Sequence, residues 1–551
     1  MYYLTMIEKI KVMMERSKVA IENMKISPVE WLITFSGILM IRFFFESLSS
    51  PSSSGIVASD APTLIHYYLF FLSVSLALML VLQYAVPTWK KIIPTVTLFA
   101  LTLITVPPVI DWIVSGGKGF SMAYLFQTPS EMVLSFLTFF GLSLKTGITV
   151  GIRVELALML IGVGWFVYLV SKSLKRSSLT VLALYIVMFV AVSVPGIITT
   201  ISNTFTASHA TSHEFLQNTI TSSQTLANNI HGTLRYSSLE RLLEIGFDFM
   251  IARIWFIVTI VLASVWFLTN FKQQTIATIK NSRLERTAHY IFLIILGIFV
   301  AYHQVHFSLN WNDYLALITL FLAFYFSWMF AVSMNDIYDV DIDQVSNQSR
   351  PIPEGVMNIS DTKASALIFL LLSLVGGYLA GYYAFFCVLA FTALYYIYSI
   401  PPLRLKRAPV LSVVIIGFCS LIAVIAGFFT VSTFKEISVF PAGLLAGIVI
   451  MFSLLPQTKD IKDIEGDSAA GIKTLATIFG SIWGPRVVGG LAGIAYLVVP
   501  FVANNMAVFI GAIPAAGVTY WISTKKPYTE RPIFIVYGLF VVFLAIILLR
   551  P

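Results

Sequence analysis

Residues 335–355 read NDIYDVDIDQVSNQSRPIPEG, and they place acidic and amide side chains where a long apolar segment ends. On a helix, Asp336, Asp339 and Asp343 would fall at positions i, i+3 and i+7, near one face. Such carboxylates repel one another unless a cation joins them. Mg²⁺ is usually bound by one or two carboxylates together with phosphate oxygens and water, so this face is typical of a metal-bound diphosphate site. A solvated helix end is the plainer alternative.

The composition of the whole chain is that of a polytopic membrane protein. Of 551 residues, 58% are hydrophobic and 11% are charged. The formal charge of +8 fits Lys and Arg gathered in cytoplasmic loops. No basic patch interleaved with aromatic residues occurs, so we expect no nucleic acid partner. Cys387 and Cys419 both lie in apolar segments, which argues against a disulfide framework and against a cysteine metal site.

The first 271 residues contain membrane segments but no recognisable chemistry. Residues 1–28 predict a basic amphipathic helix on the inner membrane surface. We expect residues 29–271 to form a separate membrane module of unknown function with about six spans. Residues 132–144 are a shorter, partial element, and residues 202–249 are polar and lie outside in this topology. The expected spans are residues 31–48, 64–86, 93–114, 154–170, 179–201 and 251–271.

A basic linker at residues 272–286 separates this module from the second half of the chain. Residues 287–551 contain about nine apolar segments of spanning length. Alternating topology places four polar loops, which carry nearly all the charge of this half, on the cytoplasmic side of the plasma membrane. These loops are residues 335–363, 401–409, 457–486 and 523–532.

A second acidic segment, KDIKDIEGDSAAGIKTL at residues 459–475, repeats the i, i+3, i+7 spacing with Asp460, Asp463 and Asp467. If the helices before the two segments meet at their inner ends, six carboxylates and Asn335 surround one cavity. This density of negative charge requires cations. We therefore expect two or more Mg²⁺ ions that bridge the acidic segments to a substrate diphosphate.

The segment YSIPPLRLKR, which begins at Tyr398, lies between the acidic segments and presents cations in a short loop after two prolines. Guanidinium groups bind phosphate oxygens bidentately, and lysine adds a compact positive charge. The positive-inside rule alone accounts for part of these charges. We predict that the diphosphate is bound by Arg350, Tyr398, Arg404, Lys406 and Lys459.

The pattern NDxxDxxxD followed by RPIPxG, then YSxPPLRLKR, then DxxDxxGD followed by GIKTLA resembles the UbiA superfamily of intramembrane prenyltransferases. The resemblance covers residues 280–551. It implies a helical bundle in which Mg²⁺ holds an isoprenyl diphosphate between the two acidic segments. Residues 283–290 depart from the family pattern, because they lack the proline that many members carry after the leading arginine. The implied metal-binding residues are Asn335, Asp339, Asp343, Asp460, Asp463 and Asp467, with Asp336 the weakest candidate, and Asp339, Asp343, Asp460 and Asp463 are the expected catalytic residues.

We therefore predict an all-α, polytopic integral membrane protein with a UbiA-like bundle after a separate module. The expected reaction is Mg²⁺-dependent transfer of an isoprenyl group from its diphosphate to a lipid-soluble acceptor. Membrane lipid is a further expected partner, and the sequence leaves the protein partner of the N-terminal module unknown. A water-poor cavity lined by Tyr325, Tyr338, Tyr395 and Tyr398 would protect the reacting carbocation. Two alternatives stay open: a cation-coupled transporter or lipid-handling protein, and a related enzyme that transfers a phosphosugar to a polyprenyl phosphate.

Overall fold

The computed structural model of the chain is built from helices. No β-strand occurs in the residues that it describes. The predicted amphipathic helix at residues 1–28 falls almost entirely outside them. The structure describes residues 12, 13, 16, 19, 26–49, 61–120, 124–126, 128–141, 148–206, 210–226, 239–433, 436–469 and 473–548.

Within these residues, 15 helical segments are long enough and apolar enough to cross a membrane, judged by length and composition. Six of these candidate spans lie before residue 272 and nine lie after it. A helix satisfies its own backbone hydrogen bonds, which is what a segment inside lipid requires. The structure therefore confirms the predicted class, an all-α polytopic membrane protein.

Backbone contacts divide the chain into two compact units. The division falls between Lys272 and Gln273, where the basic linker is expected to begin. In place of an extended linker, the chain forms a ten-residue helix there, α13 (Lys272–Asn281). The first unit contains the described residues up to Ser223, residues 239–272 and Asn310–Leu315, and the second contains residues 224–226, Gln273–Leu309 and the described residues from Ala316 onward.

In the first unit, two observed helices differ in extent from the predicted spans. The expected span 179–201 is split between α8 (Leu174–Val192) and α9 (Val194–Thr206), because Pro195 lacks the backbone N–H that a continuous helix needs. By contrast, α12 (Leu239–Asn270) begins inside the stretch predicted as a polar loop, since apolar residues already recur there at helical spacing. The other helices are α2 (Pro28–Ser49), α3 (Ala61–Ala85), α4 (Ile93–Leu101), α5 (Pro107–Val114), α6 (Pro129–Leu137), α7 (Val150–Ser171) and α10 (Ser212–Ser222).

The second unit is a bundle of long helices with short helical elements at one end. Its helix α15 (Trp311–Tyr338) has 72% of its most apolar stretch buried, the highest share among the candidate spans of the described residues. The first acidic segment thus follows a central helix. The other elements are α14 (Leu284–Gln304), α16 (Val340–Ser346), α17 (Ile359–Ala380), α18 (Tyr382–Ser399), α19 (Pro409–Val431), α20 (Ala442–Leu454), η7 (Leu455–Ile461), α21 (Ile464–Ala469), α22 (Leu475–Val502), α23 (Phe509–Thr524) and α24 (Arg531–Leu548).

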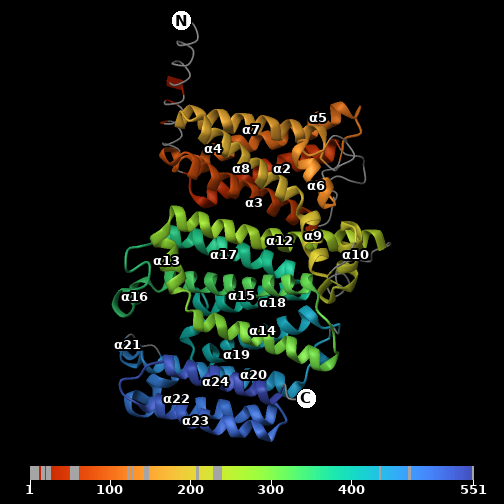
Figure 1. Cartoon of the computed structure of the whole chain (residues 1–551). Helices are drawn as coiled ribbons and strands as arrows, with labels where there is room; N and C mark the ends of the chain where they lie inside the picture. Colours follow the sequence, from red (N-terminus) through yellow and green to blue (C-terminus); the bar gives the residue numbers. More distant parts are fainter. Residues whose placement is uncertain are drawn as a thin grey trace. The chain divides into compact units, whose positions relative to one another are not determined.

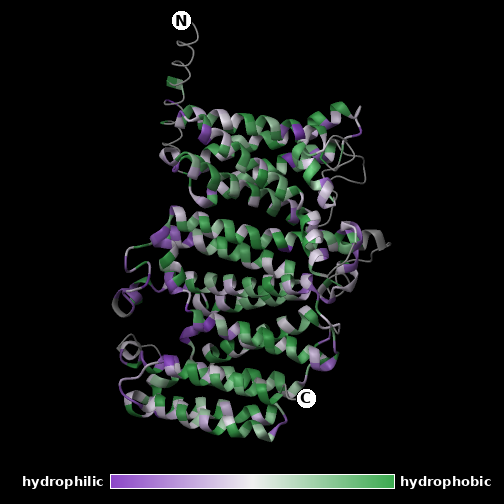
Figure 2. Ribbon diagram, viewed as in Figure 1, coloured by the Kyte–Doolittle hydropathy of each residue, from purple (hydrophilic) through white to green (hydrophobic). Residues whose placement is uncertain are grey.

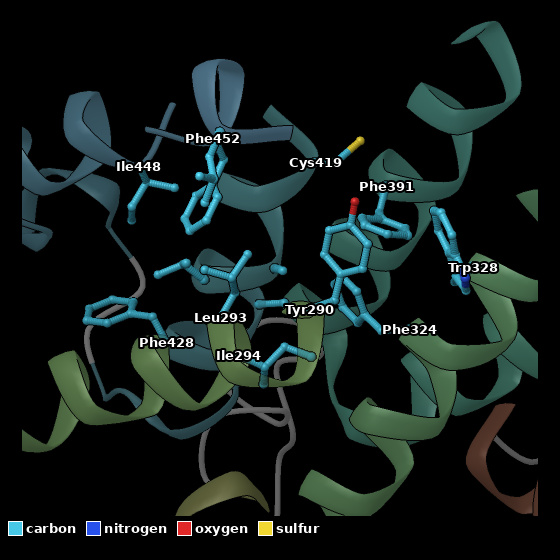
Figure 3. Packing of buried hydrophobic residues seen from close by; sticks show 14 of the residues in the cluster. Tyr290, Leu293, Ile294, Phe324, Trp328, Phe391, Cys419, Phe428, Ile448 and Phe452 are labelled. Carbon is cyan, nitrogen blue, oxygen red and sulfur yellow. The ribbon is translucent and has the colours of Figure 1, made fainter. Parts of the chain in front are cut away.

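Helices α14 and α19 pack with their backbones in contact. A Cβ atom at Gly297 would lie 1.9 Å from the Val424 carbonyl oxygen, and one at Gly427 would lie 2.0 Å from the Ile294 carbonyl oxygen. Glycine is needed at both positions for this close approach. The buried core beside the contact between α14 and α19 is rich in aromatic rings, among them Tyr290, as Figure 3 shows.

Polar residues of the second unit gather at one end of its helices. Figure 1 places α13, α16 and α21 at this end, and Figure 2 shows strongly hydrophilic residues around α13 and α16. The helices between their ends are mainly hydrophobic (Figure 2). The charged side chains are therefore concentrated where the acidic segments lie.

Candidate active site

The first acidic segment is helical on both sides of a bend at Asp339. Asp339 has φ −109° and ψ 13°, and it separates α15 from α16. Helical hydrogen bonds nevertheless continue across the bend, from Asp339 N to Asn335 O (2.9 Å) and from Asp343 N to Asp339 O (2.8 Å). The expectation of one continuous helix is therefore wrong. The bend gives Asp339 different partners from Asp336 and Asp343.

Asp336 and Asp343 share one guanidinium group. Arg350 Nη1 lies 3.2 Å from Asp336 Oδ1 and also donates to Asp343 Oδ2. Asn281 Nδ2 donates to the other oxygen of Asp336 at 2.5 Å. Burial raises the pKa of Asp343, and the charge of Arg350 opposes that rise. Both aspartates are buried, and their pairing with Arg350 offsets the cost of removing their charges from water.

Asp339 and Asn335 are held by the basic loop. Arg404 Nη2 and Lys406 Nζ both pair with the Asp339 carboxylate, and Lys406 Nζ donates to Asn335 Oδ1 at 2.9 Å. The φ angle of Arg404 is 41°, a left-handed conformation that costs a residue with a side chain about 1–2 kcal/mol. Burial lowers the pKa of Lys406, and the charge of Asp339 raises it. Three predicted diphosphate ligands, Arg350 included, thus lie against the first acidic segment.

The second acidic segment is not a continuous α-helix. Asp460 belongs to the 3₁₀ helix η7, and the chain turns before α21 begins. The Asp463 N–H bonds to the Asp460 carbonyl oxygen at 3.3 Å. This bond closes a single turn between the two aspartates, just after η7 ends at Ile461. Asp467 lies in α21, and its side chain is outside the described part of the structure.

Among the described residues, the carboxylates of Asp460 and Asp463 have no bonded partner. No hydrogen bond to either carboxylate, and no ion pair within 4.0 Å of it, occurs among the residues that the structure describes. Burial raises the pKa of Asp463, while the positive charges of Lys462 and Arg350 lower it. Positively charged side chains therefore act on both carboxylates without bonding to them.

The cations beside the second segment are bound to other groups. Lys459 Nζ donates to the Tyr398 hydroxyl at 3.1 Å and lies 5.7 Å from the centre of that ring. Arg286 Nη2 and Lys462 Nζ lie 3.7 Å and 3.8 Å from the two carboxylate oxygens of Glu530. Lys459 and Tyr398, both predicted diphosphate ligands, are thus in direct contact.

Arg350 connects the two acidic segments electrostatically. Its charge acts on Asp336 and Asp343 in the first segment and on Asp463 in the second. Both segments therefore lie within the electrostatic range of one guanidinium group. Their carboxylates remain dispersed, because no three described His, Cys, Asp or Glu side chains are grouped closely enough to hold one metal ion.

The oxygen donors of the two acidic segments nevertheless fit Mg²⁺, which does not need three protein carboxylates around one ion. Mg²⁺ keeps several waters and is usually bound through one or two carboxylates plus substrate phosphates, so dispersed pairs of aspartates suit it. Asp460 and Asp463 form such a pair, and no internal cation occupies their carboxylates. The first segment offers the same kinds of donor, namely carboxylates and the Asn335 amide oxygen, but these accept from Arg350, Arg404 and Lys406.

Aromatic rings extend from the charged groups into the bundle. The ring centres of Tyr398 and Tyr395 are 6.1 Å apart. The Tyr395 hydroxyl is hydrogen-bonded to the Tyr290 hydroxyl. Trp328 packs edge-on against Tyr395 at 5.3 Å. Of the other tyrosines predicted to line the cavity, Tyr338 is exposed and contributes its carbonyl oxygen to Arg404. The buried aromatic layer is therefore built mainly by α14, α15 and α18.

Sequence patterns missed four polar residues at this site. Asn281 binds Asp336, Arg286 and Glu530 pair with each other, and the charge of Arg283 acts on Asp336. Burial lowers the pKa of Arg283 to about 10, which keeps it protonated at neutral pH. Residues 281–286 were assigned to a linker because of their positive charge, and nothing in the motifs marks Glu530.

Solved structures and curated sequences resemble part of this chain. The structure of a UbiA homolog from Archaeoglobus fulgidus bound to GPP and Mg2+ aligns over 48% of this chain and 97% of that chain, with a TM-score of 0.38 and 21% identity. A digeranylgeranylglyceryl phosphate synthase from Methanobrevibacter smithii is 28% identical over 30% of this chain and 58% of its own length. A homogentisate solanesyltransferase from Arabidopsis thaliana is 29% identical over 41% of this chain and 62% of its own length.

The alignments with these two relatives thus span about 60% of each relative's length. The model of the UbiA prenyltransferase family matches residues 290–547, and no family model matches the N-terminal half. The predicted resemblance at residues 280–551 is confirmed almost to its limits. Over residues 290–547, the chain is thus similar to the UbiA prenyltransferase family.

Proposed function

We propose that this protein transfers an isoprenyl group from an isoprenyl diphosphate to a lipid-soluble acceptor, with Mg²⁺ as cofactor. The observation that carries this proposal is that two acidic segments and at least five cations lie at one end of a buried helical bundle (Figure 1). The match to the UbiA prenyltransferase family model supports the same reaction class. The names of the two relatives indicate different acceptors, so the acceptor class is left to experiment.

In this proposal, Asp460 and Asp463 hold Mg²⁺ directly. Asp467 is assigned to the same group of metal-binding residues because it continues the i, i+3, i+7 row. Asn335, Asp336, Asp339 and Asp343 contribute oxygens from the other side once the diphosphate has arrived. Bound Mg²⁺ neutralises charge on the diphosphate and thereby lowers the barrier to breaking the allylic carbon–oxygen bond.

Arg350, Arg404 and Lys406 bind the diphosphate through their remaining N–H groups. Each already pairs with an aspartate of the first segment, which orients it before substrate binds. Preorganised donors stabilise developing negative charge without having to reorient during the reaction. Lys459 and Tyr398 complete this set from the side of the second segment.

The buried aromatic layer holds the reacting carbon away from water. Tyr290 and Tyr395 are 3% and 7% exposed and bond to each other, so neither hydroxyl faces bulk solvent. Aromatic faces attract positive charge, which stabilises the carbocation that forms as the diphosphate leaves. The acceptor then captures the carbocation in place of water.

The apolar helices make this an integral membrane protein. We further propose that the charged end of the second unit faces the cytoplasm, because its loops carry the lysines and arginines that the positive-inside rule places there. The plasma membrane is the proposed location.

Diphosphate release tests the proposal directly. Full-length protein in lipid nanodiscs would be supplied with Mg²⁺, isoprenyl diphosphates of increasing length, and either a glyceryl phosphate lipid or an aromatic acceptor. We expect release that depends on acceptor and on Mg²⁺, and its loss in Asp339→Ala and Asp460→Ala. Unchanged release in both variants would contradict the proposed site, and transfer of a phosphosugar to a polyprenyl phosphate would replace the proposed reaction.

A further inference from the structure

Glu530 is the one acidic residue of the loop between α23 and α24, and it contacts two cations at the site. Its carboxylate lies 3.7 Å from Arg286 Nη2 and 3.8 Å from Lys462 Nζ. These cations come from different elements, α14 and the turn after η7. One carboxylate is therefore ion-paired with two cations that come from other elements of the bundle.

Neighbouring contacts fix the loop that carries Glu530. The Tyr528 hydroxyl donates to the Thr458 carbonyl oxygen of η7 at 2.6 Å. The Tyr528 ring packs against a small apolar cluster that contains Ile461 and Ile464, on either side of Asp463. The loop is thus tied to the backbone of the second acidic segment, and Glu530 keeps its place relative to Asp460 and Asp463.

The two cations are within electrostatic range of the second segment. Besides Lys459, which is bonded to Tyr398, the charge of Arg286 acts on Asp460, and the charge of Lys462 acts on Asp463. Neither cation bonds to these aspartates; both pair with Glu530. A free arginine or lysine beside an uncompensated carboxylate would be drawn to it.

We propose that Glu530 is a positioning residue that keeps Arg286 and Lys462 away from Asp460 and Asp463, so that these two carboxylates stay available to a divalent cation. The inference rests on the proposed function only in taking Asp460 and Asp463 as metal-binding residues. Glu530 itself stays outside the metal coordination shell. Its negative charge also acts on both aspartates, which further favours cation binding there.

The test is binding of Mn²⁺, followed by electron paramagnetic resonance, to full-length protein in detergent without any substrate. Glu530→Gln should weaken Mn²⁺ binding at the second segment roughly threefold to tenfold, as expected when two partly exposed ion pairs are lost. Adding Lys462→Gln and Arg286→Gln to that variant should restore most of the affinity, because the competing cations are then absent. Thermal melting of each variant confirms that it is folded.

Glu436→Gln is the matched control, since it removes one exposed negative charge from the loop between α19 and α20. It should leave Mn²⁺ affinity unchanged. If Glu530→Gln binds Mn²⁺ as tightly as the native protein, the inference is wrong. It is also wrong if the triple variant stays as weak as Glu530→Gln, because Glu530 would then be a metal ligand itself. If the proposed prenyl transfer is wrong but this inference is right, the triple variant will recover Mn²⁺ binding while the native protein releases no diphosphate.

Discussion

The two acidic segments have the same i, i+3, i+7 spacing of aspartates but opposite electrostatic surroundings. In the first segment, Arg350, Arg404 and Lys406 bond to every aspartate of the row. In the second, the two described carboxylates have no bonded cation, because Glu530 and Tyr398 hold the cations nearby. The difference shows that a shared spacing does not fix a shared task. We propose that the first segment positions the cations that bind diphosphate and that the second keeps its oxygens for metal.

Replacing Asp460 with Asn gives the largest effect that this comparison predicts. The change keeps the shape of the side chain but removes a charge for which the protein supplies no substitute. Prenyl transfer should fall by about 10²-fold or more, as when a principal electrostatic contact of a transition state is removed. Mn²⁺ binding without substrate should weaken in parallel. Retained metal affinity would place the metal elsewhere.

Replacing Asp343 with Asn should chiefly affect stability. Arg350 loses one of its two carboxylates, and a largely buried charge pair is broken at a cost of about 1–3 kcal/mol. Chemical or thermal unfolding in detergent measures this cost. Metal binding without substrate should change little. If Mn²⁺ affinity falls as far as it does in Asp460→Asn, the two segments share one task and the comparison fails.

Removal of the metal should destabilise the protein through the second segment. A ligand that binds only the folded state stabilises it by about 1.4 kcal/mol for each tenfold excess over its dissociation constant. Adding Mg²⁺ to protein treated with EDTA should therefore raise the melting temperature by a few degrees in native protein and in Asp343→Asn. The same addition to Asp460→Asn should have no effect. A shift of native size in that variant would contradict the assignment.

Replacing Lys462 with Gln alone should have the smallest effect. Its side chain is 47% exposed and its ion pair with Glu530 is long, so stability should change by less than about 0.5 kcal/mol. Mn²⁺ affinity should stay the same or rise slightly, since one cation near Asp463 is gone. A clear loss of affinity would mean that Lys462 supports the metal site instead of competing with it.

The membrane fold was largely predictable because it depends on local composition. Segments of about 20 apolar residues must form spanning helices, whatever their neighbours are. The predicted spans failed where a local feature was overlooked, as at Pro195, or where a helix continued past the apolar region, as in α12. The motifs also located both acidic segments and the basic loop, since these are continuous in sequence.

The sequence by itself determined which chemical groups the site contains: two rows of carboxylates, the cations of YSIPPLRLKR and a membrane setting. Only the tertiary structure decided which groups are paired. The partners Asn281 and Asp336, Asp339 and Arg404, and Arg286 and Glu530 come from separate elements, brought together by helix packing. Pairing depends on distances of a few ångströms, and residue type and spacing along the chain do not encode such distances. Two aspartate rows of equal spacing therefore acquire different surroundings only when the bundle assembles.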